Sequence, residues 1–331
     1  MNEVGTIMRL PTNKRPLATF ALFSYNQQNY IREAVEAALA QTYEPLEIII
    51  SDDCSVDNTF EIIKEIAANY EGPHQVRINQ NEMNMGIAAH VNSIHMIAKG
   101  ELIVHAAGDD ISLQYRTEKQ VAAWLSFNQK PSVIVSNALI MNNKGIADGS
   151  TVVSLEHANS FINGVDNKFY AVLGSSLAVS KELINFFGAL DERIMAEDVV
   201  LYRRAELLNG IYYLQQPLIK WRIHNSSVSY SCYSSKQDYI DRQKAWAADA
   251  IVRLAQHETD RSKLNLDGNG YSSRYITALS LRMIALECGY FKSCIKILVA
   301  LGKHEIALAD AKEALKIILV RLGLISPIVN K

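Results

Sequence analysis

The feature that most constrains the fold is an alternation of strand and helix patterns from residue 17 to about residue 127. Apolar runs predict strands at residues 17–23, 46–50 and 101–106, and a shorter strand is expected at 75–79. Between them, apolar residues at helical spacing predict helices near 31–39, 60–70 and 87–98. Strands that are apolar on both faces and separated by helices predict an α/β fold with a mainly parallel central sheet flanked by helices.

Polar side chains follow three of these strands. Asn26 comes after the first strand, Asp52 and Asp53 after the second, and Asp109 and Asp110 after the strand that ends the unit. Ligands of parallel sheets bind at the carboxyl ends of the strands. Two adjacent carboxylates are costly unless a cation lies beside them, so Asp109 and Asp110 predict a divalent metal on a bound diphosphate.

The second half of the chain is less regular and then becomes helical. Strands are expected at 133–140, 151–155 and 177–179, added to the same sheet, and helical patterns dominate from about residue 237. We therefore divide the chain into a lead-in at 1–16, a catalytic domain at 17–235 with a nucleotide-binding half (17–110) and an acceptor half (111–235), and a helical extension at 236–331.

Composition excludes several classes of protein. With 33 basic and 35 acidic residues and a net charge of -2, the chain has no general electrostatic reason to bind nucleic acid. Its four cysteines have no CxxC spacing, residues 1–16 do not form a signal peptide, and no apolar run approaches the roughly 20 residues of a membrane span. A cytoplasmic protein is expected, either free or peripheral at the inner face of the plasma membrane.

Seven fragments in series carry a resemblance to a known family. They are residues 23–26 (FSYN), 40–43 (AQTY), 47–59 (EIIISDDCSVDNT), 84–86 (NMG), 108–110 (GDD), 197–198 (ED) and 221–224 (WRIH). In order and spacing the chain resembles the inverting glycosyltransferases of family 2, of the bacterial polysaccharide type, which have the GT-A fold. The resemblance covers residues 17 to about 229.

The resemblance implies a site for a nucleotide-diphospho-sugar, with a UDP-sugar as the first choice. The residues it assigns to donor binding are Ser24, Asn26, Asp52, Asp53, Asn84, Gly86, Asp109 and Arg222. Asp52 would accept hydrogen bonds from uracil or ribose, or it would only cap the next helix. Asn84 and Gly86 precede a helix whose amides favour an anion, although a tight turn alone also explains them.

The same resemblance implies a Mg²⁺ or Mn²⁺ ion held by Asp109, Asp110 and His224. The chain departs from the family at Ala107, where many members carry an acid, and this lowers the expected metal affinity. The competing interpretation of the two acids is a solvated turn. His90, His95 and His105 show no metal-ligand spacing and are expected in structural roles.

Glu197 and Asp198 match the acidic pair that supplies the catalytic base of the family, with Asp198 favoured. An inverting transfer needs a carboxylate opposite the leaving diphosphate, to take the proton of the acceptor hydroxyl. Either acid could instead be an ordinary charge at the start of a helix.

The chain is thus expected to move a sugar to a hydroxyl of a saccharide or lipid-linked glycan in surface polysaccharide biosynthesis. A non-catalytic sugar-nucleotide-binding or scaffold protein is the rival from another class. A nucleotidyltransferase is disfavoured because residues 24–28 lack a Gly-rich basic loop. Lys312, Lys316 and Arg321 lie near an apolar stripe of a C-terminal helix, which fits peripheral membrane contact or packing against the catalytic domain or a second subunit.

Overall fold

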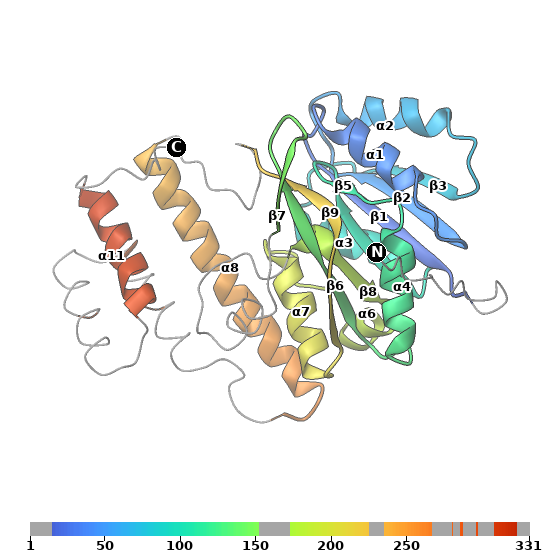
Figure 1. Ribbon diagram of the computed structural model, residues 1–331. Helices are drawn as coiled ribbons and strands as arrows, with labels where there is room; N and C mark the ends of the chain where they lie inside the picture. Colours follow the sequence, from blue (N-terminus) through green and yellow to red (C-terminus); the bar gives the residue numbers. More distant parts are fainter. Residues whose placement is uncertain are drawn as a thin grey trace, which may run out of the picture.

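The structure is a computed structural model that describes residues 15–151, 173–224, 235–266, 280, 285–286, 296 and 308–322. A nine-stranded sheet lies between two layers of helices, and the C-terminal helices stand to one side of it (Figure 1). Expectations for most of the lead-in, for residues 152–155 and for the segment after His224 fall outside the described residues.

The first half of the sheet is parallel, as the alternation of strands and helices predicts. It consists of β1 (Ala18–Ser24), β2 (Leu46–Asp52), β3 (Gln75–Gln80) and β4 (Leu102–Ala107), in the order β3-β2-β1-β4. The register pairs Ser24 with Asp52 and Phe23 with Ala107. The polar residues that follow β1, β2 and β4 therefore meet at one edge of the sheet, which confirms the expected placement of Asn26, Asp53 and Asp109 at strand ends.

The second half continues the same sheet with mixed pairing. It adds β6 (Val133–Met141), β8 (Leu177–Ser180), β9 (Ile211–Arg222), β5 (Ile111–Ser112) and β7 (Ala147–Thr151). β8 runs antiparallel to both β4 and β6, whereas β6 and β9 are parallel. Pro217 lies where the β6–β9 register shifts, as expected for a residue without an amide hydrogen. The sheet is thus parallel from β1 to β4 and mixed beyond them.

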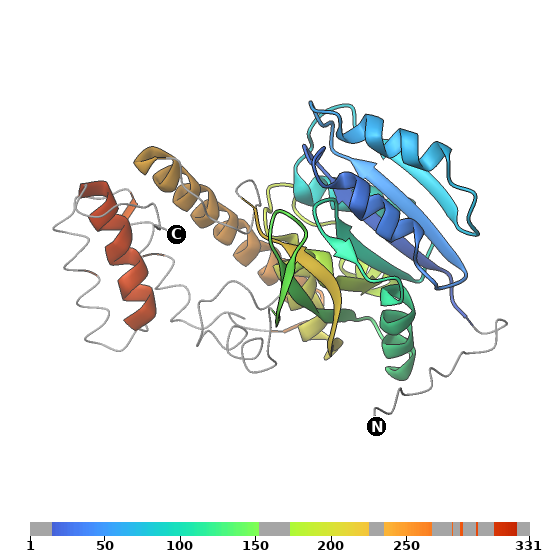
Figure 2. The ribbon, with the colours of Figure 1, turned by 45° about the horizontal axis from the view of Figure 1, so that its top comes forward.

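Two apolar layers hold the helices on the sheet. On one face lie α1 (Ile31–Leu39), α2 (Thr59–Ala68) and α4 (Arg116–Ser126), whose buried residues pack on those of β1, β2 and β4. On the other face lie α3 (Ile87–Ile97), α6 (Lys181–Phe187) and α7 (Glu197–Leu207), which pack on β6 and β8. The rotated view shows the sheet passing between the two layers (Figure 2). A rigid, doubly covered sheet therefore supports the loops at its carboxyl edge.

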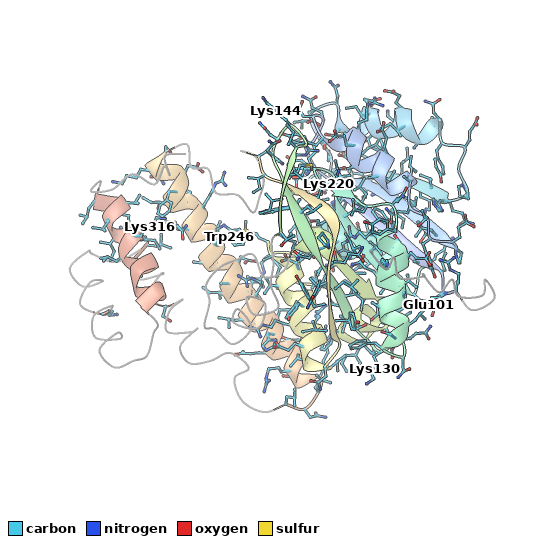
Figure 3. All side chains as sticks on the ribbon, in the orientation of Figure 1. Glu101, Lys130, Lys144, Lys220, Trp246 and Lys316 are labelled. Atoms are coloured by element: carbon cyan, nitrogen blue, oxygen red, sulfur yellow. The ribbon has the colours of Figure 1, made fainter. Side chains whose placement is uncertain are left out.

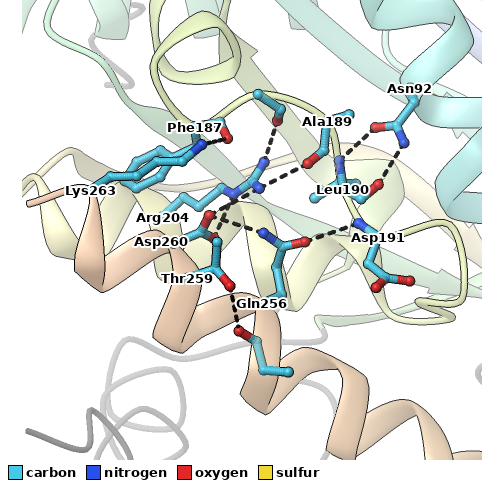
Figure 4. A network of polar contacts seen from close by, with 12 residues as sticks. Asn92, Phe187, Ala189, Leu190, Asp191, Arg204, Gln256, Thr259, Asp260 and Lys263 are labelled. Atoms are coloured by element: carbon cyan, nitrogen blue, oxygen red, sulfur yellow. Dashed lines mark hydrogen bonds and ion pairs between the residues drawn. The ribbon is translucent and has the colours of Figure 1, made fainter.

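The long helix α8 (Lys236–Ser262) docks on α7 through buried polar contacts (Figure 4). Arg204 of α7 forms a bidentate ion pair with Asp260 of α8 at 2.8 and 3.2 Å, and both side chains are at most 2% exposed. The Arg204 guanidinium also donates to the carbonyls of Gly188 and Ala189. α8 is therefore fixed to the catalytic domain by charge as well as by apolar packing.

The last described helix, α11 (Leu308–Leu322), lies beside α8 and carries Lys316 (Figure 3). Its described buried residues are Ala314, Ile317, Ile318 and Val320, while Leu315 and Leu322 are exposed. The buried side of α11 therefore faces protein, and Leu315 and Leu322 lie outside it. No described helix is long and apolar enough to cross a bilayer.

Candidate active site

The turn after β2 is organised by Asp52. Its carboxylate is fully buried and accepts hydrogen bonds from the Ser55 amide at 2.8 Å, from the Ser55 and Ser24 hydroxyls and from the Gln80 amide. Asn26 extends the same network, because its Oδ1 accepts from the Val56 amide. The structure thus uses Ser24, Asn26 and Asp52 to hold the β1 and β2 loops together, and a contact of Asp52 with a base or ribose stays a prediction.

Asp53 ties the second of these loops to the start of α3. Its oxygens accept from the amides of Met85 and Gly86 at 2.9 and 3.0 Å and from the Asn81 side chain at 2.7 Å. Asn84 Oδ1 also accepts from the Gly86 amide, at 3.0 Å. Gly86 has φ = 80°, a conformation that favours glycine. The Gly86 amide is thus bonded within the turn, and the expected part of Asn84 and Gly86 in donor binding stays a prediction.

Asp109 and His224 come together from distant parts of the chain. His224 Nε2 lies 2.9 Å from Asp109 Oδ2, and the side chains are 5% and 15% exposed. The imidazole packs on the Tyr30 ring at 4.6 Å between centroids. The ends of β4 and β9 and the start of α1 thus form one oxygen-and-nitrogen site at the carboxyl edge of the sheet.

Asp110 and Arg222 lie next to this site and hold its backbone in place. Asp110 Oδ1 accepts from the Arg222 amide at 2.8 Å, and the Ser175 hydroxyl bonds the same carboxyl group. Burial, followed by the neighbouring Asp109 charge, raises the pKa of Asp110 to about 8. The Arg222 guanidinium is 2% exposed, pairs with Glu33 and donates to the Asp109 carbonyl. In the structure the buried Arg222 side chain therefore fixes the Asp109 backbone. Its expected contact with donor phosphates stays a prediction.

Glu197 and Asp198 lie in the first turn of α7. Burial raises the pKa of Asp198 to about 6, although the amides of Val199 and Gly174 and the charge of Arg253 oppose the rise. Burial and the Asp198 charge raise the pKa of Glu197 well above its usual value. Two adjacent buried carboxyl groups with raised pKa values mark this turn as a candidate site for proton transfer, and the role of Asp198 as the base stays a prediction.

A three-residue 3₁₀ turn, η2 (Gly174–Ser176), joins the two acidic sites. The Gly174 amide bonds Asp198, and the next residue, Ser175, bonds Asp110. A Cβ atom on Gly174 would lie 2.9 Å from Glu197 Oε1, so a larger residue there would require the Glu197 carboxyl group to shift. The turn therefore connects the acid pair of α7 to the Asp109–Asp110 loop.

The donor set at Asp109 fits a divalent metal shared with a phosphate ligand. Among the residues that the structure describes, no group of three or more His, Cys, Asp or Glu side chains is placed to hold an ion. The Asp109 oxygen and the His224 nitrogen supply two adjacent ligands, and Mg²⁺ commonly takes one or two protein ligands with substrate phosphates. Asp110 is directed to Arg222 and Ser175 instead, so Asp109 and His224 are the better candidates.

Sequence reasoning missed several residues that build the site. Tyr30, Glu33 and Ser175 contact its expected members, and only the position of Tyr30 and Glu33 after the first strand could have indicated them. Asp249 and Arg253 of α8 reach the acid pair without any local signal. His90, His95 and His105 are buried in the protein, as expected for structural residues.

Sequence comparison matches part of the chain to a known family. Residues 19–138 match the model of the family described as Glycosyl transferase family 2. The putative glycosyltransferase EpsE of Bacillus subtilis is 30% identical over 46% of this chain and 54% of its own length. The uncharacterized glycosyltransferase RP339 of Rickettsia prowazekii is 24% identical over 88% of this chain and 93% of its own.

Solved structures show the same fold at low sequence identity. The chain superposes on S. aureus TarS 1–349 in complex with UDP-GlcNAc with a TM-score of 0.53, 19% identity and 92% coverage of both chains. The mannosyltransferase PcManGT of Pyrobaculum calidifontis, in complex with GDP-Man and Mn²⁺, gives a TM-score of 0.56, 15% identity and coverages of 96% and 83%. The chain therefore has the fold of the GT-A glycosyltransferases. Within it, residues 19–138 match the family 2 glycosyltransferase domain.

Proposed function

We propose that the protein is a metal-assisted, inverting glycosyltransferase that uses a nucleotide-diphospho-sugar, with a UDP-sugar as the first candidate. The observation that carries the proposal is the link through η2 between Asp110, in the Asp109–Asp110 loop, and Asp198. The loop that would hold the diphosphate and the carboxylate that would take a proton are fixed to each other by Gly174 and Ser175.

In this proposal Asp109 and His224 hold a Mg²⁺ or Mn²⁺ ion. A bound divalent ion would neutralise charge on the departing diphosphate. Arg222 keeps the Asp109 backbone in place, and Tyr30 orients the imidazole of His224. These residues bind and orient, and they take no part in proton transfer.

Asp198 acts as the general base on the acceptor hydroxyl. Its pKa of about 6 leaves it ionised at neutral pH and close enough to that pH to accept a proton in the transition state. Burial and the neighbouring Asp198 charge raise the pKa of Glu197. A hydroxyl of a saccharide or lipid-linked glycan is the proposed acceptor, and cytoplasmic assembly of surface polysaccharide is the proposed setting.

Thermal-shift binding of UDP, GDP and dTDP, each with and without Mn²⁺, tests the donor site. We expect one nucleotide to stabilise the protein only with metal, and this effect to vanish in Asp109→Ala. Asp241→Ala, which removes an exposed carboxylate of α8, is the control and should bind as wild type does. Failure of every nucleotide to raise the melting temperature would favour a scaffold protein over an enzyme.

A further inference from the structure

Helix α8 lies outside the family match at 19–138, yet its Asp249 holds the segment that leads into α7. Asp249 Oδ1 accepts from the Met195 amide at 2.7 Å and from the Ala196 amide at 3.4 Å. Asp249 is 2% exposed. Ala196 is the residue that precedes Glu197 and Asp198, so the carboxylate of Asp249 fixes the backbone on which the acid pair stands.

Arg253 completes the arrangement one turn further along α8. Its Nε donates to Asp249 Oδ2 at 2.7 Å, and the two side chains are 8% and 0% exposed. The Arg253 charge stabilises ionised Asp198, whereas the Asp249 charge acts against it. Asp249 and Arg253 are buried and Asp198 is half-buried, so both charges act on Asp198 with less screening than they would at an exposed site.

We propose that Asp249 and Arg253 are positioning residues for the candidate base Asp198, so that α8 sets both the place and the basicity of that carboxylate. The role of Asp198 as base rests on the proposed function, whereas the coupling of α8 to Asp198 does not. The other groups that face Asp198 are Glu197 on its own helix and the Gly174 amide of η2.

The coupling is measured directly by titrating the Asp198 carboxyl group in protein whose aspartate carboxyl carbons are labelled for NMR. Asp198→Asn assigns the resonance. Asp249→Asn removes a negative charge, so the pKa of Asp198 should fall by about half a unit or more. Arg253→Gln removes a positive charge, so the pKa should rise by a similar amount, and Arg253→Lys should restore it towards wild type.

The control is the other Asp–Arg pair of α8 with the same spacing, Asp238 and Arg242, whose contact of 3.1 Å is partly exposed. Arg242→Gln should leave the titration of Asp198 unchanged. The melting temperature of each variant shows whether it is folded, so that a shifted pKa of Asp198 is not confused with partial unfolding. Opposite shifts in Asp249→Asn and Arg253→Gln support the proposal, and equal titration in all folded variants overturns it.

The two proposals can fail separately. The acidic limb of the kcat/KM profile for release of UDP from UDP-GlcNAc, or of GDP from GDP-mannose, should move with the NMR titration if Asp198 is the base. Turnover in Asp198→Asn together with intact opposite shifts would refute Asp198 as base and leave the coupling to α8 standing.

Discussion

Replacing Asp260 with Asn should destabilise the protein by about 3 kcal/mol. The substitution keeps the size of the side chain and removes the charge that pairs with Arg204. Both side chains are at most 2% exposed, so the guanidinium would stay buried with neutral partners only. Breaking one partner of a buried pair typically costs about 3–5 kcal/mol. The carbonyls of Gly188 and Ala189 would still accept hydrogen bonds from Arg204. The expected loss of unfolding free energy is therefore at the lower end of that range.

Urea unfolding followed by far-UV circular dichroism measures this loss. With a slope of about 3 kcal/mol per M, the midpoint should fall by about 1 M at unchanged slope. Asp238→Asn breaks a partly exposed pair on the same helix and should cost about 0.5 kcal/mol or less. The apolar double variant Arg204→Met with Asp260→Leu should recover most of the loss, since no charge then remains buried.

The reasoning is refuted if Asp260→Asn costs no more than Asp238→Asn. Such a result would mean that water reaches Arg204 and that the contact between α7 and α8 shown in Figure 4 opens readily in solution.

The remaining predictions concern the turn η2 and the buried histidines. Gly174→Ala should lower turnover about tenfold or more at unchanged nucleotide affinity, because its Cβ would lie 2.9 Å from Glu197 Oε1 and displace the acid pair; turnover at the wild-type rate would contradict this. Burial lowers the pKa of His105 to about 3, and its Nε2 lies 2.8 Å from that of His95. Below about pH 6.5 the unfolded chain therefore takes up a proton that the folded protein refuses, and stability is lost as the pH falls. The free energy of unfolding, measured by urea titration, should fall between pH 7 and pH 5 by about 2 kcal/mol less in His105→Gln than in wild type. Equal falls in the two proteins would contradict an uncharged, buried His105.

The parallel half of the fold could be predicted because its information is local. Each strand there is apolar on both faces and ends in a polar turn, so the sequence indicates both the element and its functional edge. The mixed half could not be ordered in this way. β9 begins with half-exposed residues and crosses a register shift at Pro217, and only its pairing with β6 defines it as one long strand.

The same distinction applies to the site. Asp109 was predicted from its place after a strand and Asp198 from the family resemblance, and the role of each stays a prediction. The direction of Asp110 depends on the backbone of Arg222, more than 100 residues away in sequence, and no pattern near Asp110 reports it. Asp249 and Arg253 read as an ordinary i, i+4 pair on a helix, and only the docking of α8 on α7 brings them to Asp198.

The central claim is that Asp198 is the general base of a sugar transfer, and one pair of measurements on Asp198→Asn tests it most directly. Turnover of the nucleotide-sugar identified by thermal shift should fall about 100-fold or more, while the Kd for its nucleoside diphosphate with Mn²⁺ stays within about threefold of wild type. Loss of turnover with intact binding is the predicted result. Turnover near the wild-type rate in a folded, nucleotide-binding Asp198→Asn protein would contradict the account.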